Sequence, residues 1–196
     1  MDRISKLIND IKEYGINNKV PIMSEDTIDE IKKIIANNNI KTILEIGTAI
    51  GYSTICFASL NIDNITSIER DKNRYDIACN NVKLSKLNNT KLINEDALNI
   101  NINEMFDLII IDAAKSQNLK FLNKYKNNLN ENGIVIIDNL NFHGLVGSSD
   151  SIKSRNLRQM VRKIENFINY LNNNDEFNVK YIEVGDTIGV CKRRRL

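Results

Sequence analysis

The chain has 196 residues, of which 42% are apolar and 27% are charged, and its formal net charge is +2. This length and apolar content suit one core, so we expect a single domain over residues 1–196. No apolar run approaches the roughly 20 residues that cross a bilayer, and the charged N-terminus is unlike a signal peptide. The three cysteines lack the spacing of a disulfide framework or zinc site. We therefore expect a soluble protein of the reducing cytoplasm with no membrane partner.

Two amphipathic helices are predicted at the N-terminus, over residues 2–14 and 25–36. Ser24 is a suitable N-cap for the second helix, and acidic residues follow it in the first turn. The only proline, Pro21, falls between the two helices. These helices precede the first strand and are therefore additions to the sheet region.

Short apolar blocks then alternate with segments of helical periodicity. Strands are predicted at residues 42–46, 64–69, 91–94, 106–112 and 133–138, and helices at 52–60, 72–86, 117–129 and 151–171. Two further strands, 177–184 and 187–192, form a hairpin around Gly185 and Asp186. The alternation predicts an α/β, Rossmann-like fold: a seven-stranded, mostly parallel sheet with a C-terminal antiparallel hairpin and extra N-terminal helices.

The first predicted strand ends in a glycine turn, Gly47 to Gly51, which leads directly into a helix. Such a turn lets the backbone approach a ligand closely and directs helix N-terminal amides toward it, although Gly47 also suits a plain tight turn. The dinucleotide fingerprint needs a third glycine, but Ala49 stands at its middle position. An NAD-dependent oxidoreductase is therefore disfavoured.

Two acids follow the next two strands, at positions that suit an adenosine. Glu69 ends the second strand, where a carboxylate can accept hydrogen bonds from both ribose hydroxyls of NAD or S-adenosylmethionine. The alternative is a capping acid for the helix that begins near Asp71. Asp96, after the third strand, can accept a hydrogen bond from the adenine amino group or cap the turn that follows.

Oxygen-bearing side chains also end the fourth and fifth strands. Because adjacent parallel strands bring their carboxyl ends together, Asp112, Asp138 and Asn139 can converge into a hard oxygen site for magnesium or another divalent cation. A substrate with two neighbouring oxygens can fill positions that protein ligands leave open, and Lys115 can act as general base. Alternatively, the acids cap strand ends and Lys115 is a surface residue. The single histidine, His143, is expected in a loop at the rim.

Together these residues resemble the class I methyltransferases, and among them the cation-dependent O-methyltransferase family that includes catechol and caffeoyl-CoA O-methyltransferases. The resemblance extends from Pro21-Ile22-Met23 to the final hairpin. It implies that the methionine part of S-adenosylmethionine is lined by Glu45, Gly47 and Ser53, the ribose by Glu69, the adenine by Asp96 and the methyl group by Met23, with Asp112 touching both cofactor and metal. The metal ligands would be Asp112, Asp138 and Asn139, and the base Lys115.

Within that family the chain resembles bacterial tRNA 5-hydroxyuridine methyltransferases in particular, through residues 21–23, 144–146, 154–158 and 184–186. That resemblance implies a tRNA substrate, methylated at the wobble position, whose phosphates contact Arg155 and Arg158, and a homodimer. A small catechol-like acceptor is the alternative, and a solvated helix face is the alternative for the basic residues. A non-catalytic RNA-binding protein is disfavoured because Lys115 and the metal-ligand set are present.

Overall fold

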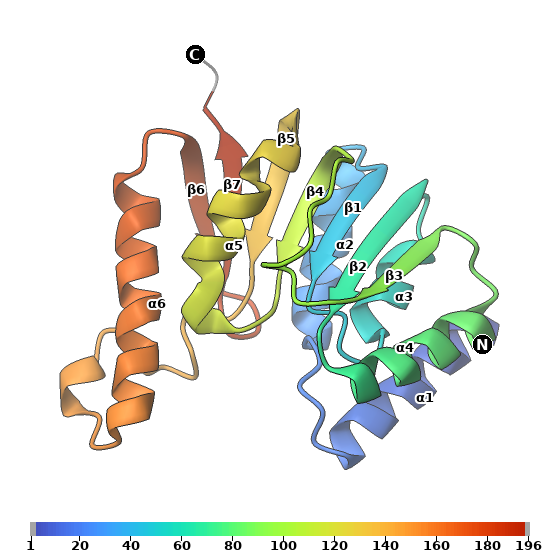
Figure 1. Ribbon diagram of the computed structural model, residues 1–196, viewed down its shortest axis with the longest axis horizontal. Helices are drawn as coiled ribbons and strands as arrows, with labels where there is room; N and C mark the ends of the chain where they lie inside the picture. Colours follow the sequence, from blue (N-terminus) through green and yellow to red (C-terminus); the bar gives the residue numbers. More distant parts are fainter. Residues whose placement is uncertain (1–2, 195–196) are drawn as a thin grey trace. The chain divides into compact units, whose positions relative to one another are not determined.

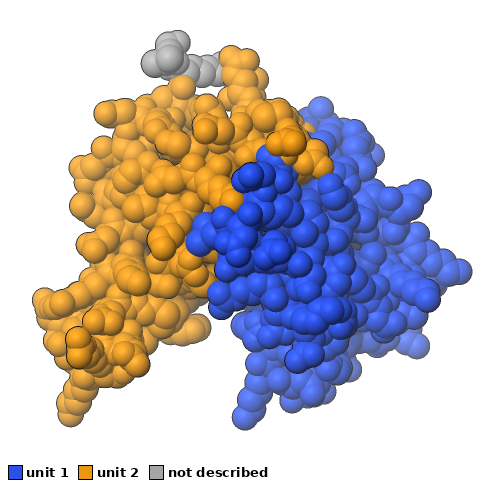
Figure 2. Space-filling model, in the orientation of Figure 1, with its two compact units in different colours: residues 1–102 blue, residues 103–196 orange. Residues whose placement is uncertain are grey.

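The computed structural model describes residues 3–194 (Figure 1). The chain forms two compact units, residues 1–102 and 103–196, which Figure 2 colours separately. The single domain expected from the length stays a prediction. Within residues 3–194, none of the helices combines the length and apolar character of a membrane span.

Unit 1 contains three parallel strands and four helices. Its elements are α1 (Arg3–Asn17), α2 (Glu25–Asn37), β1 (Thr42–Ile46), α3 (Tyr52–Ala58), β2 (Asn64–Glu69), α4 (Lys72–Ser85) and β3 (Thr90–Asn94). The strands lie in the order β3-β2-β1, and Ile46 pairs with Ile68 while Glu69 pairs with Asn94. This register aligns the carboxyl ends of the strands, so the segments that follow β1, β2 and β3 emerge at one edge.

Unit 2 contains one parallel strand pair that is extended by an antiparallel hairpin. Its elements are β4 (Phe106–Ile111), η1 (Lys115–Gln117), α5 (Asn118–Tyr125), η2 (Lys126–Asn128), β5 (Leu129–Ile137), η3 (Ser149–Ser151), α6 (Arg155–Asn173), β6 (Phe177–Ile182) and β7 (Ile188–Arg193). Strands β4 and β5 are parallel, β7 pairs antiparallel with β5, and β6 pairs antiparallel with β7. The last paired residues of β4 and β5 are Ile111 and Ile137. Asp112 and Asp138 therefore leave neighbouring strands at the same level.

Two predicted boundaries in unit 2 are wrong. The helix expected over 117–129 ends at Tyr125, and β5 begins at Leu129 rather than at residue 133. Leu129 is buried and pairs with Phe106, and Asn130 donates a side-chain hydrogen bond of 2.7 Å to Asp107. Pairing with β4 thus overrides the helical pattern at these residues.

The last helix also starts later than predicted. Residues 149–151 form a single 3-10 turn, and α6 begins at Arg155 rather than at 151. Ser154 has an extended backbone, and its side chain accepts a hydrogen bond from the Leu157 N–H, so it is the N-cap. The expected start of the first helix, Asp2, lies outside the described residues.

Candidate active site

The glycine turn after β1 is held in a left-handed conformation. Gly47, Ala49 and Gly51 have φ angles of 109°, 47° and 84°. The N–H groups of Gly47 and Thr48 both donate to the Ile68 carbonyl oxygen, at 2.9 and 3.2 Å. The turn is therefore fastened to β2, and the strain at Ala49, which has a Cβ atom, is typical of a ligand-binding loop.

Glu45 is fully buried and binds hydroxyl groups of residues in α3 and β2. Its carboxylate accepts hydrogen bonds from Ser53 at 2.5 Å, from Ser67 at 2.5 Å and from Thr54. The structure thus brings Glu45 and Ser53 together, as expected of residues that line one part of a site. Their predicted contact with the methionine moiety stays a prediction. Through these hydrogen bonds the Glu45 carboxylate connects the start of α3 to strands β1 and β2.

Ser67 and Thr54 were missed from the sequence. Ser67 also lies 2.6 Å from Thr48 in the glycine turn, hydroxyl to hydroxyl. A signal was present, because a serine that interrupts the apolar centre of a parallel strand needs a buried hydrogen-bond partner. The Ser67 hydroxyl thus supports the glycine turn directly, whereas the Thr54 hydroxyl binds Glu45.

Glu69 connects the glycine turn to α4. One carboxylate oxygen accepts a hydrogen bond from the Ala49 N–H at 2.9 Å, and the other accepts from the Asp71 N–H at 2.8 Å. The N-cap of α4 is Asp71, which accepts from the Arg74 N–H, so the capping alternative for Glu69 is wrong. Each carboxylate oxygen can accept more than one hydrogen bond, so both retain capacity for a ribose hydroxyl.

Asp96 and Met23 were the other residues predicted to contact the cofactor in this unit. Asp96 Oδ1 accepts a hydrogen bond of 2.8 Å from the Leu98 N–H, so the residue does cap its turn. Its second oxygen, Oδ2, lies 3.9 Å from the Arg70 guanidinium, and the side chain is 33% exposed. Met23 is buried in the loop between α1 and α2. The predicted adenine and methyl contacts stay predictions.

The predicted metal and catalytic residues gather at the carboxyl ends of β4 and β5. Lys115 Nζ lies 2.5 Å from Asp112 Oδ1, and both side chains are largely buried. Asp138 is 2% exposed and accepts a hydrogen bond of 2.8 Å from the Asn139 N–H. Burial, and next the negative charge of Asp112, raise the pKa of the Asp138 carboxyl to about 7. The four predicted residues thus form one electrostatically coupled cluster.

The cluster suits a hard divalent cation. Two carboxylates repel each other here, and one of them is nearly inaccessible to water, so a bound divalent cation would stabilise them, and Asn139 could add an amide oxygen. Within residues 3–194, no group of three or more His, Cys, Asp or Glu side chains is arranged to hold a metal ion. The predicted set therefore depends on the amide as its third protein ligand.

Comparison with known proteins identifies the class of enzyme. The model of the O-methyltransferase family matches residues 3–194. The chain belongs to the O-methyltransferase family. The predicted class, an S-adenosylmethionine-dependent O-methyltransferase with a Rossmann-like α/β fold that ends in an antiparallel hairpin, is confirmed.

This O-methyltransferase is also similar to individual known proteins. A Staphylococcus aureus crystal structure, provisionally named a caffeoyl-CoA O-methyltransferase, is 36% identical, with a TM-score of 0.89 over 95% of this chain and 92% of that one. An O-methyltransferase from Bacillus cereus, solved in complex with SAH, is 21% identical with a TM-score of 0.82 over 96% and 91%. A Methanocaldococcus jannaschii tRNA(Phe) (4-demethylwyosine(37)-C(7)) aminocarboxypropyltransferase is 30% identical over 63% of this chain and 52% of its own length.

The predicted RNA-contacting arginines of this O-methyltransferase differ in their surroundings. Arg155 is exposed in the first turn of α6. Arg158 is half-buried and donates hydrogen bonds to the carbonyl oxygens of Ile152 and Lys153, at 2.8 and 3.5 Å. Arg158 therefore supports the loop before α6, and Arg155 is the better placed of the two to contact a phosphate. His143 lies in an exposed loop, as expected, with 80% of its side chain exposed.

Proposed function

We propose that this O-methyltransferase uses S-adenosylmethionine and Mg²⁺ to methylate 5-hydroxyuridine at the wobble position of tRNA, giving 5-methoxyuridine. The observation that carries the chemical part is the coupled cluster of Asp112, Asp138 and Lys115. Two adjacent oxygens on the acceptor, at positions 4 and 5 of the pyrimidine, make a chelating pair like that of a catechol. A cation held by two carboxylates and an amide leaves positions for such a pair.

The residues of the cluster divide the work of methyl transfer. When bound, the cation acts as a Lewis acid and lowers the pKa of the acceptor hydroxyl. Lys115 takes up the hydroxyl proton on Nζ as the general base. The acceptor oxygen then forms a bond to the methyl carbon, and the carbon–sulfur bond breaks with its electron pair passing to the sulfonium sulfur. The products are the methyl ether, a neutral thioether and protonated Lys115, so charge and atoms balance.

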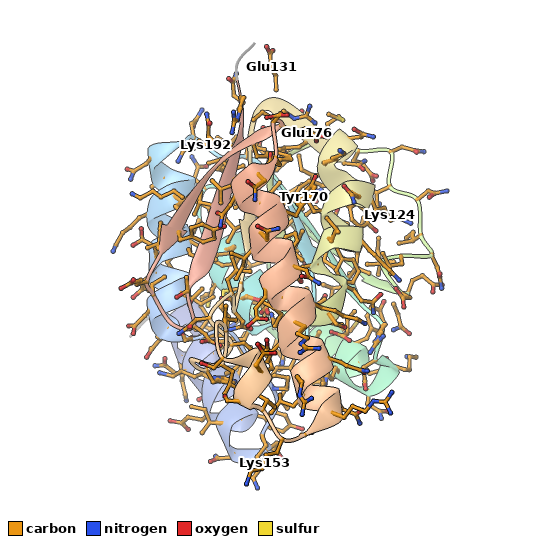
Figure 3. All side chains as sticks on the ribbon, turned by 90° about the vertical axis from the view of Figure 1, so that its left-hand side faces the viewer. Lys124, Glu131, Lys153, Tyr170, Glu176 and Lys192 are labelled. Atoms are coloured by element: carbon orange, nitrogen blue, oxygen red, sulfur yellow. The ribbon has the colours of Figure 1, made fainter. Side chains whose placement is uncertain are left out.

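A basic surface on unit 2 supports an RNA acceptor. The exposed cationic residues Lys153, Arg155, Arg162 and Lys163 lie in and just before the first turns of α6. Figure 3 shows Lys153 at this end of the helix, with Tyr170 near the other end. Phosphate contacts position RNA without reading its sequence, which suits such a cluster. One relative, named as a tRNA-modifying enzyme, also aligns with much of the chain.

A small catechol-like metabolite is the second candidate, because the same cluster serves any acceptor with vicinal oxygens. The S. aureus relative, provisionally named for caffeoyl-CoA, favours it. Both are tested with labelled S-adenosylmethionine, using tRNA from cells that lack the gene in one arm and catechol in the other, with Mg²⁺ or with EDTA. Magnesium-dependent 5-methoxyuridine on nucleoside mass analysis supports the tRNA proposal. Transfer to catechol alone rejects it, and full activity in EDTA rejects the cation.

The proposed base has its own test. Lys115→Ala should lower kcat by about a hundredfold or more, because general-base catalysis typically contributes that factor. The affinity for SAH should stay within about twofold of wild type, because the base acts only in the chemical step. Lys120→Ala, an exposed lysine of α5, is the control. A fall in SAH affinity that matches the fall in kcat would instead assign Lys115 to cofactor binding.

We also propose a homodimer that uses the exposed apolar surface of unit 1. Tyr14 and Ile16 on α1 are 44% and 60% exposed, and Leu84 on α4 is 50% exposed. Tyr14 and Leu84 line a groove of about 550 Å³ between these helices, into which side chains from a second copy of α1 can pack. Ile16→Glu should shift sedimentation toward the monomer, whereas Leu119→Glu, at an exposed apolar position of unit 2, should not. A monomeric wild-type protein at micromolar concentration would refute the dimer.

A further inference from the structure

The segment that follows β5 has an uncommon backbone conformation. Asn139, Phe142 and His143 have φ angles of 60°, 45° and 57°. Residues with a Cβ atom seldom adopt this left-handed region, although Asn and His do so more often than most, and three such residues within five positions need support from the surrounding structure. The segment begins at a predicted metal ligand, so whatever enforces its conformation also orients that ligand.

The turn between β6 and β7 holds this segment through consecutive backbone contacts. The Leu140 N–H donates to the Thr187 carbonyl oxygen at 2.9 Å, and the Asn141 N–H donates to the Asp186 carbonyl oxygen at 3.0 Å. The Leu140 side chain is buried against β7, where a Cβ on Gly189 would lie only 2.7 Å from it. The turn between β6 and β7 therefore fixes the backbone conformation of the segment that follows β5.

Asp186 supplies the last of these contacts with its side chain. Both carboxylate oxygens accept hydrogen bonds from the His143 N–H, at 2.8 and 2.9 Å. The Asp186 side chain is only 14% exposed, and its Oδ2 lies 3.5 Å from His143 Nδ1. A hydrogen bond to an ionised carboxylate is stronger than a neutral one, so this contact can hold a strained residue in place.

The site already described does not require Asp186 to touch a substrate. Its charge nonetheless acts on Asp138, where it is one of the causes that raise the pKa of that carboxyl. Asp186 is thus linked to the predicted metal ligands in two ways, by the backbone segment that it holds and by its charge. The two links can be separated, because an amide keeps a hydrogen-bond acceptor and lacks the charge.

We propose that Asp186 is a positioning residue for the cation- and acceptor-binding end of the site. By binding the His143 N–H it fixes the left-handed segment from Asn139 to His143, and this fixes the orientation of the Asn139 ligand and of the rim. The inference rests on the proposed role of Asp112, Asp138 and Asn139 as cation ligands. In this proposal the hydrogen bond from the His143 N–H to Asp186, and not the negative charge of Asp186, orients the ligand.

The test compares Asp186→Ala and Asp186→Asn with Glu183→Ala, which removes an exposed acid from the same turn. The readouts are hydrogen exchange of the His143 amide by NMR, binding of Mn²⁺ alone, and binding of SAH. Asp186→Ala should speed exchange and weaken Mn²⁺ binding by about tenfold or more. Asp186→Asn should stay within about threefold of wild type, because one oxygen can still accept the hydrogen bond. Glu183→Ala should match wild type, and SAH affinity should be unchanged throughout.

Three results would overturn the proposal. Equal loss of Mn²⁺ affinity in the Ala and Asn variants would assign the effect to charge. Unchanged exchange at His143 in Asp186→Ala would show that the hydrogen bond does not hold the segment. Loss of SAH affinity in parallel would indicate general loosening of the protein. A wild-type protein that binds no Mn²⁺ refutes the proposed cation set, whereas exchange at His143 still decides whether Asp186 holds the segment.

Discussion

Glu69 serves two partners with one carboxylate, because its oxygens hold the Ala49 N–H of the glycine turn and the Asp71 N–H at the start of α4. If the same oxygens also bind the cofactor ribose, Glu69→Ala removes both a ligand and the support of the turn. We expect SAH affinity to fall by at least about tenfold, measured by calorimetry. Asp63→Ala, an exposed acid just before β2, is the control. Unchanged affinity in Glu69→Ala would remove this residue from the cofactor site.

Asp138 makes the stability of the metal-free protein depend on pH. Its pKa is raised to about 7 by burial and by Asp112, above the value near 3.8 of a free side chain. The folded protein therefore holds this proton more tightly than the unfolded chain, and protonation stabilises the fold. The stabilisation is complete below the unfolded pKa and is lost as the pH rises through about 7.

In EDTA, the melting temperature should consequently fall between about pH 5 and pH 8. Asp138→Asn should flatten this part of the profile, because the amide does not titrate. Saturating Mg²⁺ should also flatten it if the cation binds here, since a bound cation stabilises the ionised carboxylate. Identical profiles for wild type and Asp138→Asn would mean that other groups govern the pH dependence.

At the scale of elements, two acids near the start of α4 have different roles: Asp71 caps the helix, and Glu69 is the proposed cofactor ligand. Asp71 caps α4 by accepting a hydrogen bond of 3.0 Å from the Arg74 N–H. Asp71→Ala should therefore cost about 1 kcal/mol of stability, which denaturant unfolding would detect. Asp71→Ser should recover most of the loss, because serine is also a good N-cap. A loss of SAH affinity in Asp71→Ala as large as that in Glu69→Ala would contradict this separation.

The sequence correctly predicts those elements whose ends are marked by particular residue types nearby in the chain. The strand predictions 42–46 and 64–69 match β1 and β2 because apolar blocks end there at a glycine turn and an acid. The start of β5 was missed because the pairing of Leu129 with β4 outweighs the helical periodicity, and the start of α6 because Ser154 caps that helix.

For the candidate site, the sequence places Asp112 and Asp138 together because parallel strands end at one edge of the sheet. Asp186 could not be placed in this way, since only the folded hairpin brings it to the His143 backbone.

For the whole molecule, the distribution of charge matters more than its sum. A net charge of +2 attracts RNA only weakly, but exposed cationic residues gather at the start of α6, where Arg162 also pairs with Asp150 at 2.8 Å. Each phosphate that such a residue neutralises releases counterions from the RNA. A tRNA acceptor should therefore give a kcat/KM that falls steeply with salt, whereas a catechol acceptor has no phosphate and should give a nearly flat response.

Arg155 provides the test of this difference because it is exposed, whereas Arg158 supports the loop backbone. In a plot of log kcat/KM for tRNA against log salt concentration, Arg155→Ala should reduce the slope by about one. Catechol turnover by the same variant should equal wild type, which shows that the cation site is intact. Lys120→Ala, a cationic loss of equal size on α5, should leave the tRNA slope unchanged. Equal slopes for wild type and Arg155→Ala would place the RNA on another surface, and a slope near zero in both would favour the small acceptor.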